Sequence, residues 1–420
     1  MKPVVVRRDE QEMIQNQLEA EPLSVDDFTG VEPDQQLIDR AASLVPLIRQ
    51  HAAPGSEPRF VAEPVMRALD DAGLFSLLVP RRLGGKAANL RTTMEVLAEL
   101  GRGDGSTGWA AQIFNICGWI ASTFGEQAQK EVFVDGEASR VCGNFMPGGQ
   151  SDRVDGGYRI SGRWPYVSGS FDAHWATLGI TAEAPPGEQT HAMALVPASA
   201  WTIEPTWFVT GMEGSGSDTL VVGDHFVPDH RVQPVPLMMQ GSYATPFQAS
   251  ERSSNMTLTG VGELILVPAQ LGLARHAMEV TLEKLPSKIV AYTTYGAAKN
   301  SPTHHLRVAE AITKFDMAEL LMQRAARDID SAAQEHYVLD ELQRGRIRSD
   351  TGTIVELVTA GIDELLSVNG AGSFAKANVL SRIWRDSAIA ARHAMVIPDL
   401  GKELYGRLLL GADGPLPGVV

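Results

Sequence analysis

Cysteine is scarce in this chain, which has only two, Cys117 and Cys142, among 420 residues. Two cysteines exclude a disulfide framework, and their spacing is not that of metal ligands, so their number is typical of a reducing cytosol. No apolar run reaches the 18 residues that a membrane-spanning helix needs, and the N-terminus carries acids where a signal peptide would be apolar. We therefore expect a cytoplasmic protein with no membrane contact.

Positive charge is also in deficit. The chain has 36 Lys and Arg against 51 Asp and Glu, a formal net charge of −15. This balance disfavours nucleic acid as a partner, because phosphate would repel such a surface. The sequence further lacks a dinucleotide-binding G-x-G-x-x-G after a strand, a P-loop, and histidines at metal-ligand spacing. We expect no bound metal and no NAD(P)H site in this chain.

The length and the change of pattern along the chain predict several packed parts. Residues 1–33 are rich in acids and glutamine, which predicts a mobile arm. Residues 34–138 have helical periodicity, residues 139–235 have short alternating strands broken by Gly and Pro, and residues 236–420 are helical again. Within the last part, Ser301 and Pro302 are typical of an N-cap and first turn. The predicted fold is therefore mainly α, with an N-terminal helical domain, a middle antiparallel sandwich or barrel, and a C-terminal four-helix bundle.

The segment 369–393, NGAGSFAKANVLSRIWRDSAIAARH, joins a glycine-containing loop to an amphipathic helix that delivers His393. It resembles the C-terminal part of the acyl-CoA dehydrogenase fold, including an Arg-x-x-Arg-Asp pattern at residues 382–386. In the dehydrogenases a glutamate that removes the substrate α-proton follows this pattern, and Ala394 stands at that position here. A histidine just before it resembles the two-component (group D) flavin-dependent monooxygenases, such as the oxygenases that hydroxylate steroid-derived phenols and 4-hydroxyphenylacetate.

Two segments of the middle part support the resemblance. Residues 211–228, GMEGSGSDTLVVGDHFVP, match a glycine-rich turn followed by a strand, although a β-turn that holds the sandwich explains most of these residues alone. Residues 156–175 are similar to the strand pair beside the flavin ring in this superfamily. The resemblance places Tyr166 and Val167 at the isoalloxazine edge and Ser168 near flavin N5, where we expect it to protect the oxygen-loaded flavin.

The resemblance also assigns cofactor contacts outside these strands. Residues 142–152, CGNFMPGGQSD, are similar to a loop that lines the flavin cleft, which places Asn144 and Phe145 at the cofactor and Ser151 on its phosphate side. Trp109, in a Gly-Ser-Thr-Gly-Trp helix, is expected to pack near the flavin.

In the family, a neighbouring subunit completes the flavin site, which implies a homotetramer. Here that contribution corresponds to Lys288, Asn369 and Gly370.

The resemblance implies the oxygenase component of a two-component system. A separate NAD(P)H:flavin reductase would supply reduced FMN or FAD by diffusion, and O2 would form a C4a-hydroperoxide that hydroxylates a small organic molecule, aromatic or polyketide-like. His393, as an imidazole that titrates near neutral pH, would exchange protons with the substrate or the peroxide oxygen. A histidine on an apolar helix face is more often structural, and only the family position favours catalysis.

The substrate remains open in the sequence. Cys117 stands where phenol hydroxylases carry a histidine, and Gly143 and Asn144 stand where they carry serines. We place Cys117, Asn144 and His393 at the substrate, although a buried apolar role for Cys117 is the simpler interpretation. One alternative is an N-oxygenase (nitrososynthase) acting on an amine such as an amino sugar, and another is an acyl-CoA dehydrogenase-like flavoenzyme.

Overall fold

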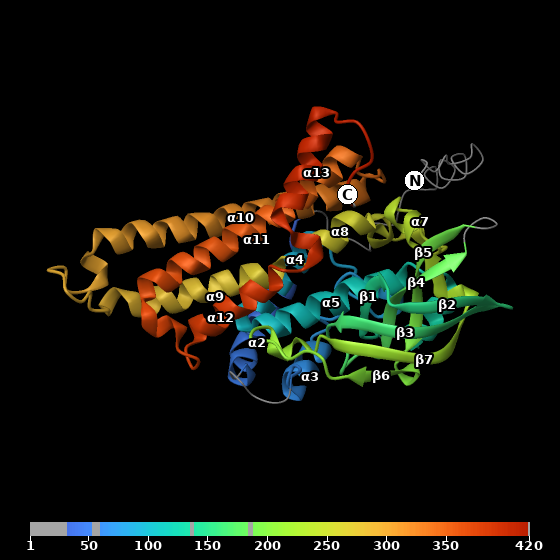
Figure 1. Ribbon diagram of the computed structural model, residues 1–420, viewed down its shortest axis with the longest axis horizontal. Coiled ribbons are helices and arrows are strands. Elements are labelled where there is room, and N and C mark those ends of the chain that lie inside the picture. The colour runs from blue at the N-terminus through green and yellow to red at the C-terminus, as the bar shows by residue number, and fades with distance from the viewer. Residues whose placement is uncertain (1–31, 53–58, 135–137, 184–187, 419–420) are drawn as a thin grey trace.

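A helical layer opens the part of the chain that the structure describes. The computed structural model describes residues 32–52, 59–134, 138–183 and 188–418, so that nearly all of the arm predicted for residues 1–33 lies outside the described residues. The first helices are α2 (Gln35–His51), α3 (Glu63–Asp71), α4 (Leu90–Gly103), α5 (Gly105–Ser122) and α6 (Glu126–Val132). In Figure 1, α4 and α5 lie between the β-strands and the long C-terminal helices. These two helices therefore form the centre of the molecule.

Two four-stranded sheets follow, in the orders β1-β4-β5-β8 and β2-β3-β7-β6. Every strand pair is antiparallel, as predicted, except β1 with β4, which run parallel. The segment 147–152 was expected to be a loop and is mostly strand, because it pairs with β3 from Gly149 onward. The strands are β1 (Val141–Pro147), β2 (Gly149–Val154), β3 (Gly157–Val167), β4 (Trp175–Glu183), β5 (Gln189–Pro197), β6 (Trp201–Glu204), β7 (Asp218–Pro228) and β8 (Val232–Pro234).

The C-terminal half is helical, as expected. Its helices are α7 (Val235–Met239), α8 (Leu258–Leu264), α9 (Pro268–Lys284), α10 (Pro302–Gln334), α11 (Glu341–Asn369), α12 (Val379–Ala390) and α13 (Pro398–Leu410). Helices α9 to α12 extend to one side as a bundle, at the left of Figure 1. The predicted start of the long helix at Ser301 and Pro302 is confirmed. No helix in the described ranges combines the length and the hydropathy needed to cross a membrane.

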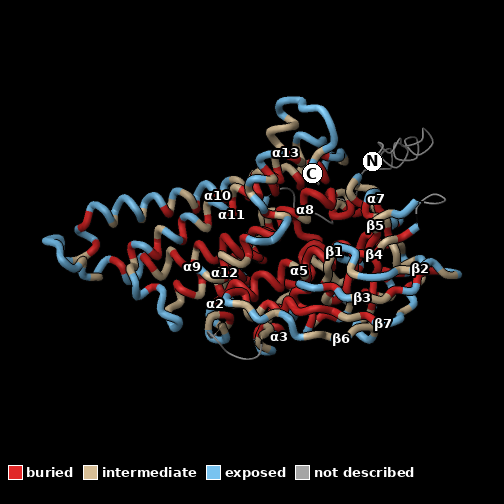
Figure 2. Tube along the Cα trace, viewed as in Figure 1, coloured by how far each residue is buried: buried red, intermediate tan, exposed pale blue. Residues whose placement is uncertain are grey.

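Glycines bring α4, α5 and α9 into backbone contact at the centre. A Cβ on Gly272 of α9 would lie 2.2 Å from the carbonyl oxygen of Ala98, and one on Gly101 would lie 2.8 Å from Ala269 Cα. A Cβ on Gly108 of α5 would lie 2.7 Å from Gly101 Cα. Figure 2 shows continuous buried chain in this region, whereas the far end of the bundle is exposed. The three helices that position the site thus share one closely packed junction.

We expect Gly272→Ala to destabilise the protein by about 1–3 kcal/mol, because the new methyl group would overlap backbone atoms of α4 that cannot move aside. Gly262→Ala in α8 is the matched control, since the nearest atom to its Cβ would be 4.0 Å away and alanine favours a helix by up to about 1 kcal/mol. Urea denaturation of both variants measures the difference. Equal stabilities would contradict the close crossing of α4 and α9.

Candidate functional site

His393 lies beyond the helix that was expected to carry it. Helix α12 ends at Ala390, and His393 has extended backbone angles (φ −63°, ψ 135°) at the start of the short 3-10 turn η12 (Ala394–Val396). Its Nδ1 accepts a hydrogen bond of 3.2 Å from the backbone N–H of Met395. The prediction of a helical position was therefore wrong, because the side chain caps the next turn. The imidazole faces the ring of Trp109 on α5, with 5.8 Å between the ring centroids.

This hydrogen bond determines the tautomer of His393. A nitrogen that accepts from a backbone N–H has no proton of its own, so the neutral ring carries its proton on Nε2. Solvent reaches the imidazole, but enclosure by protein atoms and, more weakly, the charge of Arg348 lower its pKa to about 4. Solvent contact limits this lowering, and the conclusion that we draw is a neutral ring at pH 7. His393 therefore presents an Nε2–H donor.

A chain of hydroxyl groups lies on the other side of Trp109. The indole Nε1 donates to Ser168 Oγ at 3.0 Å, Ser168 contacts Ser217 Oγ at 2.7 Å, and Ser217 contacts Ser215 Oγ at 2.7 Å. Ser215 must donate to the carbonyl oxygen of Met212, 2.8 Å away, since a carbonyl only accepts. Ser217 must then donate to Ser215, and Ser168 to Ser217. The only proton of the Ser168 hydroxyl is therefore donated to Ser217. Toward any further partner, the Ser168 oxygen can act only as a hydrogen-bond acceptor.

The loop that contains Gly211 and Met212, where the series of hydroxyl groups ends, is anchored on α12. A Cβ on Gly211 would lie 2.4 Å from the Arg385 carbonyl, so only glycine allows the approach. The N–H of Met212 donates to Asp386 Oδ1 at 2.6 Å, and Met212 itself has a left-handed backbone (φ +53°). Burial, followed by the neighbouring Asp104 charge, raises the pKa of Asp386 to about 7. The Arg-Asp pattern thus joins the sheet domain to α12, and within this turn positive φ occurs at Met212 and Gly216.

An exposed aromatic side chain lies two residues before Ser168. Tyr166 sits where the pairing of β3 with β7 shifts register, and its backbone is left-handed (φ +59°). This bulge leaves Tyr166 70% exposed, in an edge-to-face contact with Trp207 at 6.1 Å between centroids. The Val167 side chain, in contrast, is fully buried. Val167 therefore has no exposed surface for a contact with a ligand in this structure.

The residues on β1 and β2 that were predicted to contact the cofactor use their polar groups for hydrogen bonds within the sheets. Asn144 donates to the carbonyl oxygen of Pro165 at 2.6 Å and accepts from the N–H of Met146 at 2.9 Å. The carbonyl oxygen of Phe145 accepts from His191, and the Ser151 hydroxyl donates to β4 at the carbonyl oxygen of Thr181. These bonds fix the β1 bulge and the β2 edge.

Cys117 is buried on the inner side of β1, hydrogen-bonded to Thr177, and burial raises the pKa of its thiol to about 12. It is a core residue in this structure, in agreement with the simpler interpretation. The structure therefore does not place Cys117 beside His393.

Lys288, Asn369 and Gly370 come together at the far end of the bundle. The Lys288 ammonium donates to the carbonyl oxygen of Asn369, and a Cβ on Gly370 would lie 3.3 Å from Lys288 Nζ. Asn369 also donates to Thr281 Oγ1 at 3.0 Å. Figure 1 places the end of α11 away from the β-strands. These three predicted residues thus form a group at the bundle tip, separate from the group around Trp109 and from the predicted residues on β1 and β2.

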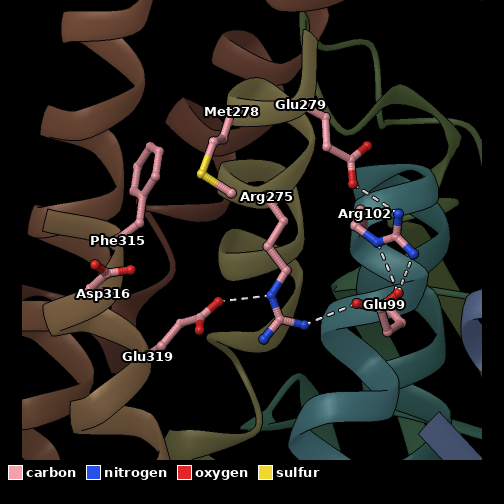
Figure 3. Close-up of a pocket in the computed structure, with 8 residues that line it drawn as sticks. All are labelled: Glu99, Arg102, Arg275, Met278, Glu279, Phe315, Asp316 and Glu319. Atoms are coloured by element: carbon pink, nitrogen blue, oxygen red, sulfur yellow. Dashed lines mark hydrogen bonds and ion pairs between the residues drawn. The ribbon is translucent and has the colours of Figure 1, made fainter. Parts of the chain in front are cut away.

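A pocket of about 320 Å³ opens between α4, α9 and α10 (Figure 3). Arg275 bonds Glu99 at 3.1 Å and Glu319 at 2.8 Å, and Arg102 bonds Glu99 and Glu279 at 2.8 and 2.9 Å. These ion pairs join three helices, although the acids that line the pocket outnumber the arginines. None of the residues predicted from the sequence lines this pocket, and we assign it a structural role.

Two buried charged residues behind His393 were not predicted. Arg348 on α11 and Glu263 on α8 have side chains that are 3% and 1% exposed, with 3.5 Å between Nη1 and Oε1. The available signal was a single acid within an apolar run, GVGELILV, which indicates a buried carboxylate. Ser217 was not predicted as a site residue either, because its pairing with Ser168 depends on tertiary contacts.

Comparisons with known proteins agree with this geometry. The family described as acyl-CoA dehydrogenase, N-terminal domain, matches residues 40–140, and the family described as acyl-CoA dehydrogenase, C-terminal domain, matches residues 264–398. The oxygenase component of an FADH2-dependent resorcinol hydroxylase from Rhizobium sp. is 32% identical over 91% of this chain and 95% of its own.

Solved structures extend the similarity to the whole fold. XiaF from Streptomyces sp., in complex with FADH2 and glycerol, has a TM-score of 0.85 and 31% identity over 98% of this chain and all of its own. The HsaA monooxygenase from Mycobacterium tuberculosis has a TM-score of 0.84 and 26% identity over 91% of this chain and 99% of its own. The predicted order of helical, β and helical parts is thereby confirmed.

We expect His393 to titrate below its ordinary pKa of 6.5, with the neutral ring protonated on Nε2. Its folded pKa is lower than its unfolded one, so the unfolded chain takes up this proton first as pH falls. His393 thus lowers the stability of the folded protein between pH 6.5 and about 4. Solid-state NMR of ¹⁵N-histidine-labelled protein across this range, with His393→Gln to identify the signal, measures the tautomer and the pKa. Titration at or above 6.5 would contradict the assignment.

Proposed function

Because this chain belongs to the flavin-dependent monooxygenase oxygenase components, which are built on the acyl-CoA dehydrogenase fold, we propose that it hydroxylates an aromatic compound beside His393 and Trp109. The relatives are named for hydroxylation of aromatic molecules, including resorcinol and p-hydroxyphenylacetate. These names fit neither the amine N-oxygenase nor the acyl-CoA dehydrogenase alternative. Ala394 occupies the place of the dehydrogenase base, and the nearby Asp399 is exposed in the first turn of α13.

The residues around Ser168 fit a reduced flavin. A flavin ring needs an aromatic or apolar wall with a few placed polar groups, and the exposed ring of Tyr166 next to Trp207 offers such a wall. Reduced flavin carries an N–H at N5, where oxidised flavin carries a bare acceptor nitrogen. The Ser168 hydroxyl, which can only accept further hydrogen bonds, matches the reduced form.

We assign reduced FAD as the preferred form, since two relatives above 30% identity are named with FADH2. When bound, reduced flavin supplies the electrons that activate O2 for transfer of one oxygen atom to the substrate. A separate flavin reductase is the partner that delivers it, as the name "oxygenase component" implies. We place both proteins in the cytoplasm, where NAD(P)H is available to the reductase.

His393 is assigned as a hydrogen-bond donor to the reacting oxygen. The single observation that carries this role is the Nδ1 contact with the N–H of Met395, which leaves Nε2–H as the group available to a ligand. The neighbouring Trp109 limits access of water and gives an aromatic substrate a surface on which to pack. A base role would need a free lone pair on Nε2, which this tautomer lacks.

A homotetramer is the proposed assembly. The bundle carries exposed apolar side chains on α9 and α10, among them Leu282, Leu306 and Leu320, and a second copy of the chain would cover them. The group of Lys288, Asn369 and Gly370 lies at the tip of the bundle, where it can complete the flavin site of another subunit only in such an assembly. Its cation favours the phosphate part of that flavin.

We expect His393→Ala to keep flavin binding but to lower product formed per flavin oxidised by roughly tenfold, because one hydrogen bond is worth about 1 kcal/mol or more. His393→Gln keeps an amide N–H near the place of Nε2 and should retain more coupling than His393→Asn, whose amide mimics Nδ1. Resorcinol and related phenols serve as first substrates, with product and H2O2 quantified together. Unchanged coupling in all three variants would remove His393 from the reaction.

We expect Ser217→Ala to reduce the preference for reduced over oxidised flavin. Without Ser217 the proton of Ser168 loses its acceptor and becomes free to donate, which favours the bare N5 of the oxidised form. Anaerobic titration with FADH2 and aerobic titration with FAD give the two dissociation constants, and we expect their ratio to fall about tenfold. Ser170→Ala is the matched control, because Ser170 donates to the Gly216 carbonyl outside the chain of hydroxyls. A ratio equal to that of the wild type would contradict the direction assigned to the chain.

A further inference from the structure

One peptide group connects His393 to a buried arginine. The N–H of the Ala394–Met395 peptide donates to His393 Nδ1 at 3.2 Å, and the carbonyl oxygen of the same peptide accepts from Arg348 Nη2 at 3.2 Å. Arg348 Nη1 donates in addition to the carbonyl oxygen of Met395. The guanidinium therefore binds the carbonyl group of the peptide whose N–H faces the imidazole, together with the next carbonyl along the chain.

The guanidinium is itself held in place. An arginine cannot lose its proton in a protein, so a buried one needs a carboxylate close by. Glu263, 3.5 Å away on α8, is the acid that faces Arg348, and neither of its oxygens has a hydrogen-bond partner within the described residues. Burial raises the pKa of Glu263 to about 8, and the Arg348 charge opposes that shift. Removing one member of such a buried pair is costly, because the other group is then left buried without its partner. The Glu263 carboxylate is thus available to direct Arg348.

The chain after His393 lies directly on α11, independently of these charges. A Cβ on Gly352 would be 2.7 Å from Pro398 Cα, and one on Gly401 would be 2.7 Å from the Arg348 carbonyl oxygen. These two close contacts, one turn apart on the same face of α11, hold residues 398–401 against the helix. The Arg348 contacts therefore act just before a segment whose position is already fixed.

We propose that Arg348, oriented by Glu263, is a positioning residue that keeps His393 in the tautomer with its proton on Nε2. The carbonyl bond from Arg348 polarises the Ala394–Met395 peptide, which strengthens the N–H···Nδ1 bond and disfavours a proton on Nδ1. Without it, the ring exchanges tautomers and turns an acceptor nitrogen toward the ligand. This inference rests on the donor role proposed for His393.

Arg348→Met tests the inference, and Arg346→Met is its matched control. Arg346 lies two residues earlier on α11 and pairs with Asp328 on α10, away from residues 394 and 395. In ¹⁵N-histidine NMR at pH 7, we expect Arg348→Met to populate the Nδ1–H form of His393 at a level comparable to the Nε2–H form. Coupling of flavin oxidation to product should fall toward that of His393→Ala, whereas Arg346→Met should match the wild type in both measurements.

Two further variants separate positioning from a general structural effect. Arg348→Lys restores a cation that can bond one carbonyl, and it should recover part of the Nε2–H population. In the His393→Ala background, Arg348→Met should lower coupling no further, because the two changes remove the same interaction. A full additional loss in that background would overturn the proposal.

Arg348→Met alone leaves the Glu263 carboxylate buried without its partner, which can prevent folding. The double variant Arg348→Met with Glu263→Gln removes both charges and is then measured in its place. A folded variant of either kind that keeps the wild-type tautomer overturns the proposal. Unchanged coupling in His393→Ala would refute the proposed role of His393 instead, and the tautomer measurement would still decide the role of Arg348.

Discussion

The contact between the Gly211 loop and α12 is the constraint on which the site depends. The missing side chain of Gly211 lets this loop reach the Arg385 carbonyl, and Asp386 then fixes the N–H of Met212. That contact joins the sheet domain, which carries Ser168, to the helical domain, which carries His393. Trp109, on the central helix α5, touches both residues. A shift of the sheet domain against α12 would separate the groups that make the chemistry possible.

The Arg-x-x-Arg-Asp pattern therefore has a physical meaning beyond family membership. Arg382 and Arg385 donate to backbone carbonyls of two loops, at Ala52 and Thr210, and Asp386 accepts from a third backbone group. Each of these side chains forms a hydrogen bond with the main chain of another part of the molecule. Because these bonds do not involve position 394, the residue there can change without breaking them. Ala394 in place of the dehydrogenase glutamate is consistent with this.

Much of the fold followed from the sequence because it rests on local rules. Helical periodicity predicted α2, α4 and α5, and the Ser301–Pro302 pair predicted the start of α10. The parallel pairing of β1 with β4 was missed, since strand direction depends on which distant segment becomes the neighbour. The helix expected to reach His393 stopped at Ala390 because the imidazole accepts from the following turn, an interaction that competes with helix continuation.

The site was predicted only in part for the same reason. Trp109, Ser168 and His393 were selected by family resemblance, and the structure brings them together. Asn144 and Ser151 were predicted to contact the cofactor, but their polar side-chain groups form hydrogen bonds inside the sheets. Arg348 and Glu263 are 85 positions apart in the sequence and lie on different helices. No local sequence pattern connects a buried acid with the tautomer of a distant histidine.

Tyr166 shows what this arrangement costs. A non-glycine residue in the left-handed region carries roughly 1 kcal/mol or more of strain, and its large ring gains little from burial because it is exposed. Glycine would relax the bulge at once, yet it would remove the aromatic wall beside Ser168. The chain thus keeps a locally unfavourable residue where a ligand can use it. Selection for thermal stability alone would favour the loss of Tyr166, and a thermostabilised descendant would have to be checked there for lost function.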